Sequence, residues 1–207
     1  SLMDKIYAER TLQIAWQRVR SNRGAAGIDR ISIERFEGQA EQYLQELHEQ
    51  LKTGTYQPQA VKRVKIPKAS GGTRPLGIPT VKDRVVQMAI KLAIEPIFEH
   101  TFRDSSHGFR PERSGKDALR EVDTWLKAGY TWVVDADIKG YFDTISHKLM
   151  MSKVEQYIAD KRLLRLLESY LKQDIMTECA SWKPSQGTPQ GAVLSPLLAN
   201  IYLNELD

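Results

Sequence analysis

The chain has 207 residues, of which 41% are hydrophobic, so it can bury the core of one domain or of two closely joined subdomains. It contains no run of eighteen apolar residues and no signal-peptide pattern, which argues against a membrane partner and predicts a cytoplasmic protein. The single cysteine, Cys179, cannot form an internal disulfide or a zinc site on its own, so any metal would need oxygen ligands, as Mg²⁺ does.

The formal net charge of +4 is unevenly distributed along the chain. Residues 61–91 contain one acid, Asp83, and eight basic residues. The basic residues of this band are Lys62, Arg63, Lys65, Lys68, Arg74, Lys82, Arg84 and Lys91. So dense a band predicts a phosphate-binding surface, and an ordinary solvated face is the alternative.

The spacing of apolar residues, glycines and prolines predicts alternating helical and extended segments. In chain order we expect a helix over 4–20, a loop over 24–29, a helix over 32–52, strands over 60–67 and 73–78, helices over 81–98 and 114–127, a mostly buried strand over 131–138, helices over 147–158 and 161–172, a strand over 175–180 and a helix over 194–206. This mixture predicts an α+β fold that is rich in helices and has small antiparallel sheets.

Several single residues indicate where these segments begin, turn and end. Gly71 and Gly72 predict a hairpin turn between the first two strands. Pro96 is expected to kink or shorten the end of its helix. Ser114 and Ser195 are expected to cap the helices that follow them, the second with Pro196 in its first turn.

Two acids lie near the end of the apolar stretch 131–138. Asp135 and Asp137 are two residues apart, so on a strand both carboxylates would project from one face. One reading is that an acid caps the turn that follows. The other is a magnesium site, because catalysis by Mg²⁺ requires rigidly held carboxylate oxygens beside open coordination positions. The aromatic residue Phe142, five positions after Asp137, favours the second reading.

The second constellation is the stretch 187–196, which contains two glycines around a Pro-Gln pair. Gly187 and Gly191 would let the backbone approach a bulky ligand closely, and Gln190 offers both a donor and an acceptor. An ordinary loop that leads into a helix is the alternative.

The third constellation is Lys68 and Arg74 on facing strands, which could close over a triphosphate or simply protect a basic edge strand from aggregation.

Four ordered segments resemble the motifs of reverse transcriptases, namely residues 68–74, 107–114, 137–143 and 187–196. More narrowly, the chain resembles the group II intron-encoded reverse transcriptase/maturases, because the loop at 24–29 is similar to the extension that those enzymes carry before the fingers. The resemblance implies an N-terminal extension with a template-facing loop at 1–54, fingers at 55–128 and a partial palm at 129–207.

The resemblance also implies roles for individual residues. Asp137 matches the first catalytic carboxylate, with the backbone carbonyl of Ile138 as a further metal ligand. Phe142 matches the gate that excludes a ribose 2′-hydroxyl. Lys68 and Arg74 match the residues that hold the triphosphate, and Gln190 and Gly191 match the segment near the incoming nucleotide. The residues assigned to the template or RNA surface are Gly24, Gly27, Asp29, Lys62, Arg63, Lys65, Arg110 and Arg113.

The chain departs from the family pattern in three places. Arg30 and Ala192 stand where glycines are expected, and the Tyr-x-Asp-Asp box that supplies the second and third carboxylates is absent from these 207 residues. The resemblance implies two Mg²⁺ ions in the complete enzyme, so we expect the 207 residues alone to be catalytically incomplete. Apolar surface left exposed by the missing contacts could also allow a homodimer to form.

The expected partners are an RNA template, intron RNA, a DNA primer and deoxynucleoside triphosphates. Two alternatives stay open at this point. The chain could serve as an RNA-binding maturase module without polymerase activity, which its basic band alone would support. It could also belong to a retron, diversity-generating or CRISPR-associated reverse transcriptase, since these share several of the motifs.

Overall fold

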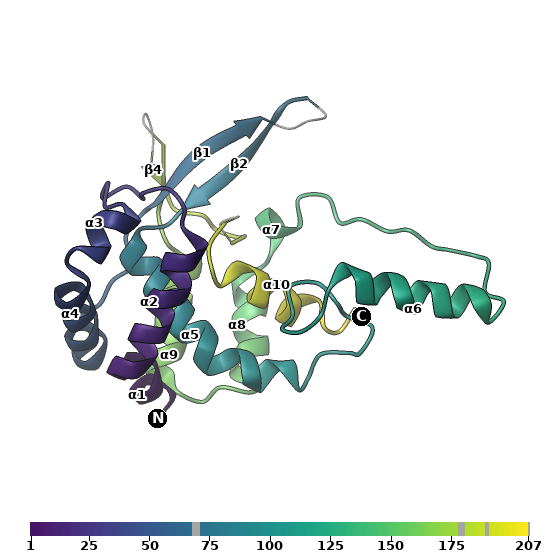
Figure 1. Cartoon of the computed structure of the whole chain (residues 1–207), viewed down its shortest axis with the longest axis horizontal. Helices are drawn as coiled ribbons and strands as arrows, with labels where there is room; N and C mark the ends of the chain where they lie inside the picture. The colour runs from purple at the N-terminus through teal and green to yellow at the C-terminus, as the bar shows by residue number, and fades with distance from the viewer. Residues whose placement is uncertain (68–70, 178–180, 189–190, 207) are drawn as a thin grey trace.

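The computed structural model describes residues 1–67, 71–177, 181–188 and 191–206. In chain order the elements are α1 (Leu2–Tyr7), α2 (Glu9–Asn22), α3 (Ile33–Glu37), α4 (Ala40–Thr53), β1 (Val61–Pro67), β2 (Thr73–Ile78), α5 (Val81–Glu99), α6 (Gly115–Lys127), α7 (Tyr141–Thr144), α8 (His147–Glu155), α9 (Lys161–Leu171), β3 (Ile175–Met176), β4 (Ser181–Trp182) and α10 (Ser195–Leu203). The helix-rich α+β class is therefore confirmed (Figure 1). None of the described helices is both long enough and apolar enough to span a bilayer.

Helix α5 is the centre of the hydrophobic core. Its N-terminus is capped by Thr80, whose hydroxyl accepts the backbone N–H of Asp83. The helix presents Val85, Ile90 and Ile94 to the interior, where all three side chains are fully buried. Three helices from the N-terminal part of the chain, α1, α2 and α4, contact α5 (Figure 1). The helix continues past Pro96 to Glu99, so the proline does not shorten it.

Both predicted N-terminal helices are interrupted in the structure. The first divides into α1 and α2 at Ala8, whose ψ of 133° is not helical. The second divides into α3 and α4 around Gly38 and Gln39. Ser32 caps α3 as a side-chain acceptor, and Gly54 ends α4 in the left-handed conformation. The interruptions let short helices turn around α5 instead of running past it.

The strands form one mixed sheet in the order β2-β1-β3-β4. β1 and β2 pair as the predicted antiparallel hairpin, with Ile66 opposite Arg74. β1 and β3 run parallel, so the expectation of purely antiparallel sheets is corrected. The predicted strand over 175–180 is replaced by β3 and β4, which pair antiparallel, and residues 178–180 lie outside the described part of the chain.

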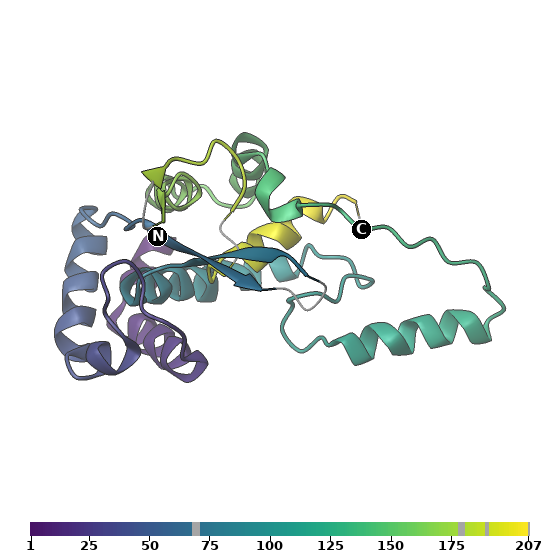
Figure 2. The same ribbon diagram turned by 90° about the horizontal axis from the view of Figure 1, so that it is seen from above.

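The prediction of a mostly buried strand over 131–138 is wrong. These residues have no strand pairing and are all exposed, with Trp132 at 97% and Val134 at 95% exposure. The chain leaves α6 and returns to α7 as an extended segment, which lies to one side of the other helices in both views (Figures 1 and 2). An apolar stretch becomes a buried strand only beside a partner strand, and no described segment pairs with it.

The C-terminal helices largely follow the prediction. Helices α8, α9 and α10 lie within the expected ranges and close the core beside α5. The expected cap at the start of α10 is wrong, because Leu194 is the N-cap residue and Ser195 is already helical. The hydroxyl of Ser195 instead lies 2.7 Å from that of Thr188. The serine therefore joins the helix to the preceding loop.

Candidate functional site

The basic band divides into two groups in the structure. Lys82 pairs with Glu46 at 2.7 Å and Lys91 with Glu95 at 3.3 Å, so both charges are engaged within the protein. The exposed members lie on the β1–β2 hairpin and are Lys62, Lys65 and Arg74. Lys68 is outside the described residues. The hairpin, rather than the whole band, is thus the candidate phosphate-binding surface.

The stretch 187–188 is bonded to the backbone around α7. Gly187 donates its N–H to the carbonyl of Ile145, and Thr188 donates to the carbonyl of Phe142, both at 2.8 Å. A Cβ at Gly187 would lie only 2.8–2.9 Å from backbone atoms of Phe142 and Asp143. Only glycine permits this approach, and the close neighbour is the protein's own backbone, whereas the sequence had suggested a bulky ligand. The half-buried Phe142 is therefore fixed to this loop through main-chain bonds.

His147 provides a further contact to the same loop. Its Nε2 lies 2.6 Å from the carbonyl oxygen of Gly187. Because a carbonyl can only accept, this ring nitrogen is the donor. The sequence analysis did not single out His147, which follows the N-cap Ser146 of α8. The feature of the sequence that could have indicated this residue is its position one helical turn after the motif at 137–143.

Gly191 lies against the strand β2. A Cβ there would be 2.7 Å from the carbonyl oxygen of Gly77 and 2.8 Å from the side chain of Leu76, and its φ is +101°. Both constraints require glycine. Gln190, assigned to the nucleotide segment with Gly191, lies outside the described residues. Ala192 is buried without a positive φ, so the alanine at this position causes no backbone strain.

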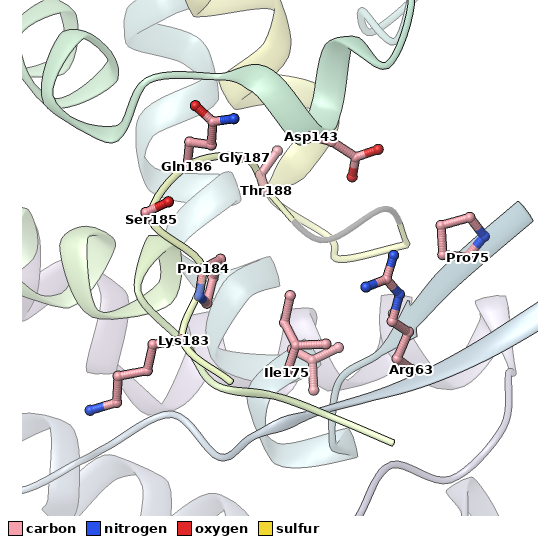
Figure 3. A pocket seen from close by; sticks show the side chains of 12 residues that line it. Arg63, Pro75, Asp143, Ile175, Lys183, Pro184, Ser185, Gln186, Gly187 and Thr188 are labelled. Carbon is pink, nitrogen blue, oxygen red and sulfur yellow. The ribbon is translucent and has the colours of Figure 1, made fainter. Parts of the chain in front are cut away.

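A cavity of about 350 Å³ separates the hairpin from the loop before Gly187. Figure 3 shows Arg63 and Pro75 on the hairpin side, Asp143 from α7 on the opposite side, and Lys183 to Thr188 along the remaining wall. The charged residues of this lining are Arg63, Lys183 and Asp143, and the Lys183 amine points away from the other labelled side chains in Figure 3. A cavity of this size suits a nucleotide-sized group. Lys183 and Asp143 were not singled out as site residues from the sequence.

The candidate metal ligands Asp135 and Asp137 are exposed, and the Ile138 side chain is 45% exposed. In the part of the chain that the structure describes, no three acidic, histidine or cysteine side chains lie close enough to hold a metal ion. The described residues therefore do not by themselves fit a two-Mg²⁺ centre, because one carboxylate cannot organise both ions. The expectation that the 207 residues alone are catalytically incomplete stays a prediction.

The N-terminal loop 24–29 is held against α5. A Cβ at Gly27 would lie 2.7 Å from the Cα of Thr80, so the glycine allows the two backbones to touch. The carboxylate of Asp29 accepts the N–H of Ile31. Arg30 adopts a φ of +58°, which explains why glycine is expected there. Arg84, buried on α5, donates to the carbonyls of Arg23 and Ala25 at 3.3 and 2.6 Å.

The assignment of Arg110 to a template-facing surface is corrected by the structure. Its guanidinium is buried and donates to Glu99 and to the carbonyls of Arg103 and Ser106. A buried, fully engaged cation organises its own loop and offers no charge to a nucleic acid. Arg113 is partly exposed and donates to Asp104.

Asp83 lies at the centre of a buried polar network. From the sequence it was noted only as the one acid in the basic band. Its carboxylate accepts from the hydroxyl of Tyr56 at 2.5 Å, from that of Thr80 at 2.7 Å and from the N–H of Gln59. Burial raises the pKa of Asp83 from 3.8 to about 6, although the bonds from Tyr56 and Thr80 lower it. The network fixes the chain that enters β1.

Comparisons with known proteins identify the family to which the chain is similar. The family model described as "Reverse transcriptase (RNA-dependent DNA polymerase)" matches residues 66–207. Protein YkfC of Escherichia coli (strain K12) is 43% identical over 193 residues, which are 90% of this chain and 51% of YkfC. Group II intron-encoded protein LtrA of Lactococcus lactis subsp. cremoris is 42% identical over 195 residues, which are 94% of this chain and 32% of LtrA.

A solved structure has a similar fold. A chain of a partial Cas6-RT-Cas1–Cas2 complex superposes on all of this chain with a TM-score of 0.67 and 25% identity, and the match covers 34% of that chain. The present chain thus spans 32–51% of the length of the relatives described here.

Proposed function

Because the chain belongs to the reverse transcriptase family, we propose that the full-length protein containing it is an RNA-directed DNA polymerase of the group II intron type. The observation that carries the proposal is the junction of three motifs. The loop at 187–191 contacts the Phe142 backbone at one end and the base of the basic hairpin at Gly77 at the other. A nucleotide held by the hairpin would therefore lie beside the aromatic gate.

The remaining roles follow from this junction. Arg74 is exposed on the hairpin and would bind the triphosphate together with Lys68. Phe142 would pack under the sugar, where its ring leaves no room for a 2′-hydroxyl. Gly191 with Gln190 would border the incoming nucleotide. Arg63 and Lys183, which line the cavity beside the hairpin, would contact backbone phosphates of the template.

Metal ions would complete the site only in the full-length protein. Asp137 and the carbonyl of Ile138 would supply the ligands from this chain, and Mg²⁺ would stabilise the charge that develops on the transferred phosphate. The other carboxylates would come from outside these 207 residues, and the same additional residues would cover the apolar side chains of 131–138. We infer that the 207-residue chain alone does not polymerise DNA.

Primer extension on an RNA template tests the proposal in the full-length protein. We expect Asp137→Asn to abolish incorporation of deoxynucleotides, because the carboxylate charge is lost. Phe142→Ala should retain incorporation and admit ribonucleotides. An Asp137→Asn variant with wild-type activity would overturn the metal assignment. Unchanged sugar discrimination in Phe142→Ala would overturn the gate assignment.

A second candidate function is binding of structured RNA without polymerisation, as in a maturase module. The exposed Lys62, Lys65 and Arg74 favour it, because phosphate contacts need no active site. Filter binding of the full-length protein to structured RNA distinguishes the two. RNA binding with no incorporation of deoxynucleotides under any metal condition would favour this candidate over the polymerase.

A further inference from the structure

Gln87 is a buried polar residue on α5 that the roles above leave unexplained. Its side chain is 1% exposed and lies among the apolar residues of the helix. Its Oε1 accepts the backbone N–H of Val193 at 2.9 Å and lies 3.5 Å from the N–H of Leu194. The contact joins positions 106 residues apart in the chain.

An amide in this position requires a reason. A methionine or leucine would fill the same space in the core without a desolvation cost, whereas a buried amide is tolerated only when it is hydrogen-bonded. The N–H of Val193 belongs to a loop and has no helical partner, since α10 begins two residues later. Gln87 therefore provides the acceptor for this N–H.

The loop that Gln87 holds is fixed at three further points. The hydroxyls of Thr188 and Ser195 lie 2.7 Å apart across its base. Gly191 packs on Gly77 of the hairpin, and Thr188 donates to the carbonyl of Phe142. Residues 188 and 191, which flank the pair at 189–190, are thus both anchored. Gln87 is the anchor at the end nearest α10.

We propose that Gln87 is a positioning residue for sugar discrimination, which acts by holding the 187–194 loop in register with Phe142. The inference rests on the proposed polymerase function and deepens it. Without the Gln87 oxygen, the Val193 N–H loses the partner that fixes its position. Because Thr188 is bonded to the Phe142 carbonyl, movement of the loop also moves the backbone that carries the gate. The Phe142 ring then packs less tightly against the 2′ position of the sugar.

The test compares three variants of the full-length enzyme. Gln87→Leu removes the acceptor, and Gln87→Glu retains an acceptor oxygen at the same place. Gln173→Leu is the matched control, since Gln173 is also buried and bonds a distant backbone carbonyl, that of Gln59. The measured quantity is kcat/KM for a deoxynucleotide divided by kcat/KM for the matching ribonucleotide. We expect this ratio to fall about tenfold in Gln87→Leu, the effect of one lost hydrogen bond, and to stay near the wild-type value in the other two.

Hydrogen exchange of the same proteins gives a readout that does not depend on activity. Peptides spanning residues 191–196 should exchange faster in Gln87→Leu and at the wild-type rate in Gln173→Leu. If the wild-type enzyme is active but Gln87→Leu matches Gln173→Leu in both measurements, Gln87 has no positioning role. If the wild-type protein incorporates no deoxynucleotide, the proposed function fails, while the exchange rates still show whether Gln87 holds the loop.

Discussion

The hydrophobic core around α5, called the packed unit below, and the segment at residues 115–138 differ in which side chains they bury. In the packed unit even charged and amide side chains are buried, as Asp83, Arg84 and Gln87 demonstrate. In the 115–138 segment large apolar side chains such as Trp125 and Trp132 are exposed. The difference teaches that burial here follows the availability of partners rather than the polarity of the residue.

Each buried polar residue of the packed unit holds a different piece of chain. Asp83 holds the entry to β1, Arg84 holds the N-terminal loop, and Gln87 holds the loop before α10. Helix α5 is therefore both the hydrophobic centre and the common support of the candidate site. The stretch 131–138, which carries Asp137, has no comparable support among the described residues, and we expect it to acquire one in the full-length protein.

Truncation of an apolar side chain should give the largest difference in stability loss between the two regions. Ile90→Ala, in the fully buried core of α5, should lower the free energy of unfolding by about 2–5 kcal/mol. Trp132→Ala should change it by less than about 0.5 kcal/mol, because the ring is 97% exposed. Urea unfolding of the 207-residue chain measures both. Equal losses in the two variants would show that the 115–138 segment packs in solution.

The buried carboxyl of Asp83 should make stability depend on pH. Its pKa is raised from 3.8 to about 6 in the folded state, so folding favours the protonated form. The resulting stabilisation is fully present below about pH 4 and is lost as the pH rises through 6. The stability of the wild type relative to Asp83→Asn should therefore increase by on the order of 3 kcal/mol between pH 7.5 and pH 4. A pH-independent difference in urea unfolding would refute the assignment.

Adding one methyl group should distinguish a close backbone contact from open space. Gly27→Ala places a Cβ 2.7 Å from Thr80, and we expect it to cost about 1–3 kcal/mol. The matched control is Gly115→Ala in α6, where a Cβ meets nothing within 4 Å. Thermal unfolding should show the control at or slightly above wild-type stability. A tolerated Gly27→Ala would mean that the N-terminal loop does not rest on α5.

The smallest expected effect concerns the exposed charges. Lys62→Ala combined with Lys65→Ala should reduce the slope of log K against log salt for RNA binding by about two, since each lysine neutralises one phosphate. Lys116→Ala, an exposed lysine on α6, should leave the slope unchanged. Filter binding across a salt series measures the slopes. A larger change for Lys116 than for the hairpin pair would move the RNA surface to α6.

Local signals predicted the hairpin and α5 well. The Gly71-Gly72 turn and the flanking β-pattern determine β1 and β2 without reference to the rest of the chain. The Thr80 cap that begins α5 is a local signal that the sequence analysis did not use. The need for glycine at 187 and 191 was also predictable, although the close neighbours are Phe142, Asp143 and Gly77 of the chain itself and the predicted ligand stays untested. These features depend on neighbouring residues or on backbone geometry alone.

Features that depend on distant partners were not predictable. The stretch 131–138 has the composition of a buried strand, yet its burial requires a partner strand that the described residues do not contain. Arg110 looked like a surface cation, but Glu99 and two carbonyls enclose it. Gln87 carried a usable signal, since a polar residue within an apolar helical run needs a buried partner. The sequence could not show that the partner lies at Val193.

RNA-templated primer extension by the full-length protein and by the 207-residue chain, measured side by side with deoxynucleotides and Mg²⁺, tests the central claim most directly. We expect extension by the full-length protein and none above background by the shorter chain, which contains Asp137 but not the other carboxylates. Extension by the 207-residue chain at a rate near that of the full-length protein, or no extension by the full-length protein, would contradict the account.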